Sequence, residues 1–535
     1  MIYPKTFVSK HLEQETKFSD IAKVRKALFD LRQSYLVVTR DQEYSLVEHP
    51  SSSNLDTEVE FASFLPSINP SEMGDPEFCK AHNVNAAYVA GAMANGIGSA
   101  EICIAMGKAG MLGFFGAGGL HPRKVKEAIQ RIQSELGSRP YGFNLLHNPF
   151  EPSIEEATVN MYLEHEITRV SASAYLGLTS YLLHYRLKGL HRDKNGQVVA
   201  KNHIFAKLSR SEVARQFMAP APMNMVNELL RMGKISSQEA ELSQFIPVAE
   251  DITAEADSGG HTDNRPLVTL LPTFINLRDA AMQQYGYTNR IRVGASGGIS
   301  TPQSVQAAFA MGASYVMTGS INQAAVEAGT SDFVKEALTK VEPHDVIMAP
   351  AADMFEMGVK LQVLKKGSMF AMRAQKLYNL YQAHSHIDEI PQAERIKIEK
   401  QIFQKSLNEV WSETETFFQD RDPSQLVKAA KDPKHKMALI FRWYLGKSSL
   451  WAISGEPSRK MDYQVWAGPA QGAYNEWVRG TEFEEAKNRS VVSIAHKLLS
   501  GAAILVRLQT LKQAGVALAP ELESVKPGEG MECWL

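Results

Sequence analysis

The sequence predicts an α/β protein built on a (β/α)8 barrel, with a small N-terminal appendage and a mainly helical C-terminal region. Between about residues 86 and 349, short apolar runs alternate with amphipathic stretches. Eight such units in roughly 260 residues match the size of this fold. A doubly wound dinucleotide-binding sheet would need GxGxxG after its first strand. Gly116–Gly119 follows the second run and has a different spacing.

The apolar runs predict the strands, and the amphipathic stretches between them predict the helices. The predicted strands are Ala87–Ala90, Leu112–Phe115, Tyr141–Leu146, Ile167–Ser171, His203–Leu208, Ile246–Glu255, Ile291–Ala295 and Ser314–Thr318. The predicted helices include Pro122–Leu136, Ile154–His165, Ser211–Met218, Phe274–Tyr285 and Pro302–Met311, several with apolar residues at i, i+3 and i+4.

Three regions follow from this pattern: an appendage and linker at 1–80, the barrel at 81–349 and a helical cap at 350–535. The appendage carries a predicted helix (Asp20–Arg32), two strands (Ser34–Val38 and Tyr44–Glu48) and a polar linker at Ser51–Asn54. In the cap, the predicted helices are Met354–Lys366, Ala371–Tyr381, Gln392–Ser412, Gln425–Lys431, Lys436–Leu445 and Ser490–Ala514.

Composition narrows the possible classes of protein. The net charge of −2 provides no global basic field for nucleic acid or a membrane surface. We find no apolar run long enough to span a bilayer and no signal-peptide core after Met1. The three cysteines lie far apart without a CxxC pair, which argues against disulfides or zinc and predicts a cytoplasmic protein.

Two glycine-containing loops at successive strand ends predict a phosphate site. They are Gly294–Ser300 and Thr318–Ile321, and in a barrel they follow strands seven and eight, where phosphate often binds. Glycines let backbone N–H groups approach phosphate oxygens, and a helix N-terminus adds unpaired donors. The candidate binders are Gly297, Gly298, Gly319 and Ser320, although either loop alone is also consistent with a tight turn.

Other polar and small residues at strand ends complete the candidate site. His261 follows Gly259 and Gly260 after the sixth run, which places its imidazole at the barrel mouth, with Glu255 and Asp257 as possible orienting groups. Met93 after the first run could line a flat ring, and Asn144 could bind a ring edge. Strand-end packing and local backbone hydrogen bonds are the alternatives.

Several of these segments occur together, and in order, in a known superfamily. The runs GAMANGIGSAEICIAMGKAGMLGFFGAGGL (91–120), YGFNLL, EADSGGH, VGASGGIS and VMTGS resemble the nitronate monooxygenase (2-nitropropane dioxygenase) superfamily. This resemblance implies a barrel that binds FMN. It covers about residues 86 to 332.

A closer resemblance extends into the C-terminal region. The stretches 255–279, 349–378 and 462–477 are similar to the PfaD family, whose members act in trans as enoyl reductases of polyunsaturated fatty acid and polyketide synthases. The resemblance implies FMN and NADPH as cofactors, 2-enoyl thioesters on acyl carrier protein as substrates, and a homodimer. It implies His261 as the catalytic residue and an FMN site formed by Ala92, Met93, Asn144, Ser296, Gly297, Gly298, Gly319 and Ser320.

That function predicts a carrier-protein surface and an apolar channel. A basic cluster just after the barrel is a candidate for docking an acidic carrier, and it consists of Lys360, Lys365, Lys366, Arg373 and Lys376. The tryptophan-containing stretch from Trp443 to Trp477 is a candidate channel wall. An ordinary solvated surface and core anchors of the cap are the respective alternatives.

Two other functions remain open at this level. A nitronate monooxygenase would use the same barrel with the histidine as a base, and a non-catalytic flavin-binding protein would help to assemble a synthase. An inosine-monophosphate-dehydrogenase-like enzyme needs a nucleophilic cysteine in a mouth loop, and neither Cys79 nor Cys103 has that position.

Overall fold

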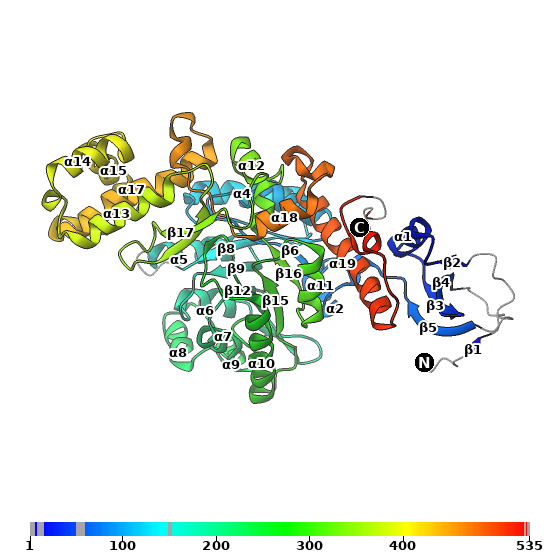
Figure 1. The fold of residues 1–535 in the computed structure, drawn as a ribbon. Coiled ribbons are helices and arrows are strands. Elements are labelled where there is room, and N and C mark those ends of the chain that lie inside the picture. The colour runs from blue at the N-terminus through cyan, green and yellow to red at the C-terminus, as the bar shows by residue number, and fades with distance from the viewer. Residues whose placement is uncertain (1–5, 8–14, 50–58, 148–151, 529–530, 532–535) are drawn as a thin grey trace.

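A closed barrel of eight parallel strands forms the centre of the protein (Figure 1). The computed structural model describes residues 6–7, 15–49, 59–147, 152–528 and 531. Around the barrel the strand order is β12-β13-β15-β16-β6-β7-β8-β9. The strands are β6 (Tyr88–Ala90), β7 (Leu112–Phe115), β8 (Gly142–Leu146), β9 (Arg169–Ser173), β12 (His203–Leu208), β13 (Asp251–Glu255), β15 (Arg292–Ser296) and β16 (Val316–Thr318). Every predicted apolar run overlaps one of them, which confirms the predicted fold class.

Large side chains fill the inside of the barrel, and a short helix closes the end where the strands begin. Alternate strand residues point inward, so Phe114, Phe205 and Tyr315 meet in the centre. The helix α2 (Pro76–His82) adds Phe78, whose ring stacks on Tyr315 with centroids 4.5 Å apart. Because α2 closes the end of the barrel where the strands begin, a ligand site is expected at the opposite end, where the strands finish.

A buried charged cluster fixes α2 against the strand starts. Asp251 accepts hydrogen bonds from His82 Nε2 at 2.9 Å and from Arg292 Nε at 2.6 Å, and its side chain is fully buried. Arg169 donates to His82 Nδ1 at 3.4 Å, so the histidine is held as a neutral ring that donates through Nε2. Burial lowers the pKa of His82 to about 4, although the neighbouring Asp251 carboxylate acts in the opposite direction.

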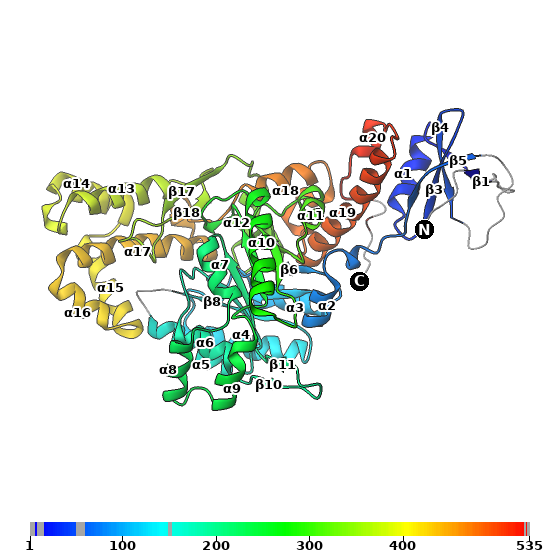
Figure 2. The same ribbon diagram turned by 90° about the horizontal axis from the view of Figure 1, so that it is seen from below.

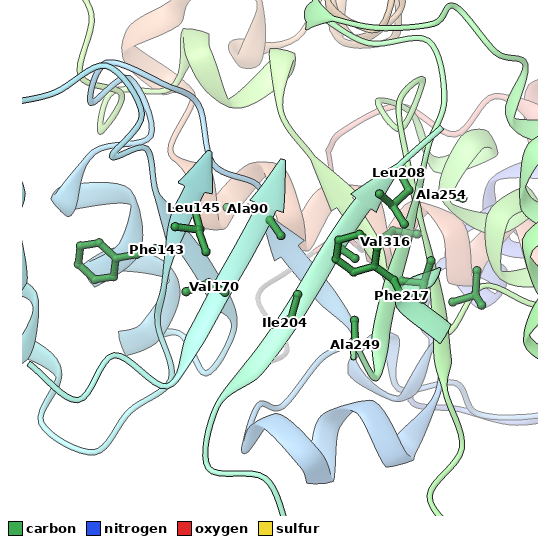
Figure 3. Close-up of a cluster of buried hydrophobic side chains, with 14 of the residues drawn as sticks. Ala90, Phe143, Leu145, Val170, Ile204, Leu208, Phe217, Ala249, Ala254 and Val316 are labelled. Atoms are coloured by element: carbon green, nitrogen blue, oxygen red, sulfur yellow. The ribbon is translucent and has the colours of Figure 1, made fainter. Parts of the chain in front are cut away.

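Helices surround the barrel, and apolar side chains fill the layer between them and the strands (Figure 3). Phe143, Leu145, Val170 and Ile204 point outward from their strands into this layer. The helices that follow the strands include α3 (Ala100–Lys108), α4 (Pro122–Leu136), α5 (Pro152–Glu164), α6 (Ser180–Leu187), α7 (Ser211–Met218), α8 (Met223–Arg231), α9 (Ser237–Leu242), α10 (Leu267–Tyr285) and α11 (Pro302–Ala310).

The helix that completes this ring comes from near the C-terminus. α19 (Val491–Gln513) packs against α11 and α3, the helices after strands seven and one. Gly501 on α19 permits this contact, because a Cβ there would lie 2.5 Å from Pro302 Cγ. The expectation that no apolar run is long enough to span a bilayer is wrong by length and composition: among the described residues, α19 is the one helix that meets both criteria. However, 72% of its apolar window is buried inside the protein.

The N-terminal residues form a separate sheet docked on α19 (Figure 2). Its strand order is β1-β5-β3-β4-β2, with α1 (Ile21–Phe29). The strands are β1 (Thr6–Phe7), β2 (Thr16–Lys17), β3 (Tyr35–Arg40), β4 (Glu43–Glu48) and β5 (Val59–Leu65). The predicted helix and strand pair are confirmed, β5 was not predicted, and the predicted linker at Ser51–Asn54 lies outside the described residues.

Between β16 and α19 the chain forms a hairpin and a helical lobe on the side away from the N-terminal sheet (Figures 1 and 2). After α12 (Asp332–Leu338) come β17 (Val346–Pro350) and β18 (Lys360–Leu364), which pair antiparallel. The lobe contains α13 (Phe370–Ala383), α14 (Gln392–Ile398), α15 (Leu407–Arg421), α16 (Ser424–Lys431) and α17 (Pro433–Ser454), and α18 (Ala470–Val478) leads back to α19.

Two helix predictions in this region are wrong. Met354–Lys366 is a turn followed by β18, because Gly358 adopts a φ of +71° and the next residues pair with β17 and with β14 (Gly260–His261). The predicted helix Gln392–Ser412 is interrupted at Gln404, whose φ is +56°, and α15 begins after the Ser406 cap.

Candidate active site

The two glycine loops lie side by side at the open end of the barrel. β15 and β16 are adjacent parallel strands, so the loops that follow them emerge at the same edge. At Gly298 and Gly319 a Cβ would meet no described protein atom within 4 Å. The N–H groups of Gly298, Ile299 and Gly319 have no hydrogen-bond partner among the described residues. The loops therefore present free donors and open space, which is what a phosphate group requires.

The other residues predicted in these loops have structural contacts. Gly297 has a φ of +81°, and its Cβ would lie 2.5 Å from the carbonyl carbon of Ala256. A glycine is therefore required at this position, because only a residue without a Cβ lets the loop after β15 pack against the loop after β13. The hydroxyl oxygen of Ser320 accepts the N–H of Gly468 at 3.2 Å, and Ser296 is almost fully buried at the end of β15.

The loop after the first barrel strand packs closely on the loop after the second. Met93 lies beside Gly116, where a Cβ would approach the Met93 carbonyl oxygen to 1.7 Å. The same carbonyl accepts the N–H of Gly98 at 2.9 Å. Ala92 packs against the barrel interior. This arrangement places a small residue and a thioether at the mouth, and the cofactor contacts assigned to them stay predictions.

Asn144 points into the barrel near its open end and is 5% exposed. Its Nδ2 donates to the Ser171 carbonyl at 3.1 Å and to Ser173 Oγ at 3.3 Å, so its nitrogen serves the local structure. Its Oδ1 faces Gly118, where a Cβ would lie 2.9 Å away. The amide is thus held in one orientation, with its oxygen toward the loop after β7.

His261 lies at the open end, and its ring is held by Asp353. Nε2 is 3.1 Å from Asp353 Oδ1, and the two side chains are 35% and 29% exposed. Burial alone would lower the pKa of His261, but the charge and hydrogen bond of Asp353 outweigh it, and Glu255 adds to them, so the pKa is raised. The site therefore favours a protonated imidazole.

Neither of the predicted orienting groups touches the imidazole. Asp257 accepts hydrogen bonds from Gln362 Nε2 of β18 and from Asn264 Nδ2 of its own loop, both at 2.8 Å, and the first of these fixes the loop to β18. Glu255 forms an ion pair with Lys207 at 2.8 Å. Asp353 was missed because it follows β17, 92 residues along the chain from His261, next to a segment predicted as helix.

Two further polar groups lie at the mouth, and sequence analysis predicted neither Lys207 nor His147 as a site residue. Lys207 and Glu255 lie two positions beyond the inward-pointing Phe205 and Thr253, so their ion pair also faces the interior. His147 directly follows β8 and binds the buried Glu155 through Nδ1 at 2.8 Å. A histidine directly after an apolar strand was the available sequence signal for His147.

The C-terminal region covers part of the mouth. Gly468 packs directly on Gly259 of the histidine loop, and a Cβ on either residue would approach the other segment to 2.9 Å. From α17, Ser449 accepts a hydrogen bond from Asn95 of the first mouth loop at 3.3 Å. The segment after the barrel therefore contacts three mouth loops, those that contain Asn95, Gly259 and Ser320.

The predicted docking and channel residues are mostly engaged in structural contacts. Lys366 pairs with Asp345, Arg373 with Asp462 and Lys376 with Glu394, so three members of the basic cluster are neutralised. Trp443 donates to Glu413, and Trp477 donates to the Val525 carbonyl in the C-terminal segment. These contacts favour the alternative that the tryptophans are anchors of the folded core.

Comparisons with known proteins agree with this architecture. The nitronate monooxygenase family model matches residues 79–393, and the model of the inserted helical domain of [acyl-carrier-protein] S-malonyltransferase matches residues 384–463. The first covers most of the barrel and the second covers most of the lobe.

Three relatives are similar over most of the chain. A polyunsaturated fatty acid synthase protein of Thraustochytrium sp. is 45% identical over 478 residues, which cover 87% of this chain and 32% of that protein. Polyketide biosynthesis protein PksE of Bacillus subtilis is 46% identical over 449 residues, which cover 83% and 58%. The chain thus spans less than two thirds of either curated relative.

The solved enoyl reductase domain of MlnA from Bacillus amyloliquefaciens has a TM-score of 0.78 and 41% identity, over 82% of this chain and 100% of that one. The chain therefore belongs to the nitronate monooxygenase family and is similar, over the whole of that domain, to the enoyl reductase domain of MlnA.

Proposed function

We propose that this chain is an FMN-dependent enoyl reductase that acts in trans on 2-enoyl thioesters carried by acyl carrier protein, with NADPH as the reductant. The observation that carries the proposal is the combination, at one barrel mouth, of two open glycine loops and a carboxylate-held histidine. The similarity to the enoyl reductase domain of MlnA, over the whole length of that domain, supports it.

The residues at the mouth fit FMN. The free N–H groups of Gly298, Ile299 and Gly319 would hold its phosphate, and the open space beside the two glycines would admit the phosphate oxygens. Met93 and Asn144 would line its ring system. When bound, FMN would supply the capacity to transfer a hydride from a nicotinamide nucleotide to an alkene.

The chain itself would supply the proton and the substrate orientation. Reduction of a 2-enoyl thioester adds hydride at the β-carbon and a proton at the α-carbon, while negative charge develops on the thioester oxygen. His261, whose ring is oriented by Asp353 and whose pKa is raised by that carboxylate, can donate the proton or hydrogen-bond this oxygen. The Lys207–Glu255 pair supplies fixed charges at the interior end of the site.

The names of the relatives support the substrate class. The Thraustochytrium protein is a subunit of a polyunsaturated fatty acid synthase, and PksE is a polyketide biosynthesis protein. The lobe is similar to an inserted domain of an enzyme that acts on acyl carrier protein. The homodimer and the cytoplasmic location are also proposals.

The similarity to the enoyl reductase domain of MlnA, at 41% identity over the whole of that domain, favours this proposal over a nitronate monooxygenase. The hydrogen bond between His261 and Asp353 suits either function, because an imidazole held by a carboxylate can donate or accept a proton.

The test is an absorbance spectrum of the purified protein with FMN, followed under argon. Addition of NADPH should bleach the flavin bands, and addition of a crotonyl thioester should restore them with formation of the butyryl product. His261→Ala should keep the flavin and lower turnover by roughly 10²–10⁴-fold. A colourless protein that does not bind added FMN would refute the proposal. Bleaching without reoxidation by the thioester would leave only a flavin-binding protein without reductase activity.

A further inference from the structure

We propose that Asp353 is a positioning residue that holds His261 as an oriented proton donor, and that the helical lobe sets the position of Asp353. The inference rests on the proposed function for the role of His261. It goes beyond that function by assigning the control of this histidine to a segment outside the barrel.

The contact between the two side chains is specific. Asp353 Oδ1 lies 3.1 Å from His261 Nε2, and both groups are only partly exposed. A carboxylate that accepts an N–H from the ring fixes the ring orientation and stabilises its positive charge. The charged groups around the pair are Glu255 of β13, which favours the protonated ring, Lys207 of β12, which opposes it, and Arg442 of α17, which faces Asp353.

The loop that carries Asp353 is anchored in the lobe by the residues that follow. Phe355 is fully buried, and its ring packs against Tyr378 and Tyr381 of α13, with centroids 5.4 and 5.2 Å away. Glu356 lies 3.4 Å from His435 and 3.5 Å from Arg442, both on α17. Burial would raise the pKa of Glu356, but these two groups outweigh it and lower the pKa.

Asp353 therefore lies between two different bodies of the protein. The histidine loop belongs to the barrel and is fixed to β18 by the β14–β18 pairing. The Asp353 loop joins β17 to β18 and inserts Phe355 into the lobe core. A change in how α13 and α17 pack would move the carboxylate relative to the imidazole.

The first readout is the reaction of His261 with diethyl pyrocarbonate as a function of pH, measured by peptide mass spectrometry. Of the two protonation states of histidine, this reagent modifies only the neutral one. The extent of modification of the His261 peptide as a function of pH therefore reports the protonation of His261 without any turnover. In the wild type, the midpoint should lie above that of N-acetylhistidine. Asp353→Asn should move it to lower pH, and Asp353→Glu should restore part of the difference.

The matched control is Asp257→Asn, a change of the same charge in the histidine loop at a carboxylate that does not touch the ring. Its profile should match the wild type. A lobe variant, Glu356→Gln, should move the His261 midpoint in the same direction as Asp353→Asn although it touches neither His261 nor Asp353.

The second readout separates the two halves of the proposed reaction. Asp353→Asn should leave bleaching of the flavin by NADPH unchanged and slow reoxidation by crotonyl thioester at pH 8 by about 10- to 100-fold, the effect of one lost charged hydrogen bond. Unchanged reoxidation together with an unchanged modification profile would overturn the inference. A wild-type midpoint at or below that of N-acetylhistidine would overturn it even if no variant folds. Failure of bleaching in the wild type would instead count against the proposed function.

Discussion

The cradle formed by the two glycine loops can be tested at Gly319 without disturbing the fold. Gly319 has a φ of −131° and a ψ of −81°, and a Cβ there would meet no described protein atom within 4 Å. Gly319→Ala therefore creates no clash within the protein, and placing a Cβ at these backbone angles should lower the free energy of unfolding by about 1 kcal/mol. Gly297 is less suitable, because its φ of +81° and the nearby Ala256 backbone would destabilise the protein itself.

The added methyl group should instead act on the ligand. It would occupy the space in which, under the proposed function, a phosphate would pack against Gly319 Cα and accept the free N–H. Loss of one hydrogen bond to a charged group costs about 1.5–3 kcal/mol. The dissociation constant of FMN should therefore rise by about 10- to 100-fold.

The assay is a titration of the apoprotein with FMN, followed by quenching of flavin fluorescence, together with thermal unfolding with and without FMN. Gly528→Ala is the control, because its Cβ also meets no described atom and it lies in the C-terminal segment. Without FMN, Gly528→Ala should unfold like the wild type and Gly319→Ala should be only slightly less stable. Only Gly319→Ala should lose stabilisation by FMN. If Gly319→Ala binds FMN as tightly as the wild type, phosphate does not lie in this cradle.

The remaining predictions concern the buried charges. Asp251→Asn should lower the free energy of unfolding by about 3–5 kcal/mol, measured from the urea midpoint, because it leaves Arg292 and His82 without their shared carboxylate; a loss below about 1 kcal/mol would contradict this. The folded pKa of His82 is about 4 against 6.5 when exposed, so only the unfolded state gains this proton as the pH falls from 6.5. The free energy of unfolding should therefore decrease by about 2–3 kcal/mol as the pH falls from 6.5 to 4.5. The lowered pKa values of Glu250 and Asp251 affect stability only at lower pH. His82→Gln should abolish the decrease between pH 6.5 and 4.5. Arg507 donates to the carbonyl groups of Ala27, Asp30 and Pro66, so Arg507→Met should release the N-terminal sheet, which limited proteolysis would detect as earlier cleavage before residue 70; an unchanged cleavage pattern would show that the apolar contacts with α19 are sufficient.

Local sequence pattern was sufficient for the barrel because each strand carries its own signal. Runs such as His203–Leu208 and Leu112–Phe115 are apolar, short and bounded by polar or glycine residues, and the structure places β12 and β7 at these positions. The glycines of the two mouth loops are also a local signal, since the close approach of the backbone at Gly297 admits no side chain; their binding of phosphate stays a prediction.

The sequence did not predict, or predicted wrongly, the contacts between elements that are far apart in the chain. The stretch from Met354 to Lys366 contains good helix formers, yet its second half forms the strand β18. It does so because β17 pairs with one edge of this strand and β14 with the other. α19 reads as an isolated apolar helix, and only the packed barrel shows that it fills the place between α11 and α3.

The sequence by itself determined the barrel, the two glycine loops and the histidine at the mouth, because these depend on periodicity and on residues that are neighbours in the chain. Only the tertiary structure decided which carboxylate holds His261. Glu255 and Asp257 are nearer in sequence, but their charges are taken by Lys207 and by the amides of Asn264 and Gln362. Asp353 reaches the imidazole because β18 pairs with β14 and the lobe holds the connecting loop, and contacts of this kind leave no periodic trace in a sequence.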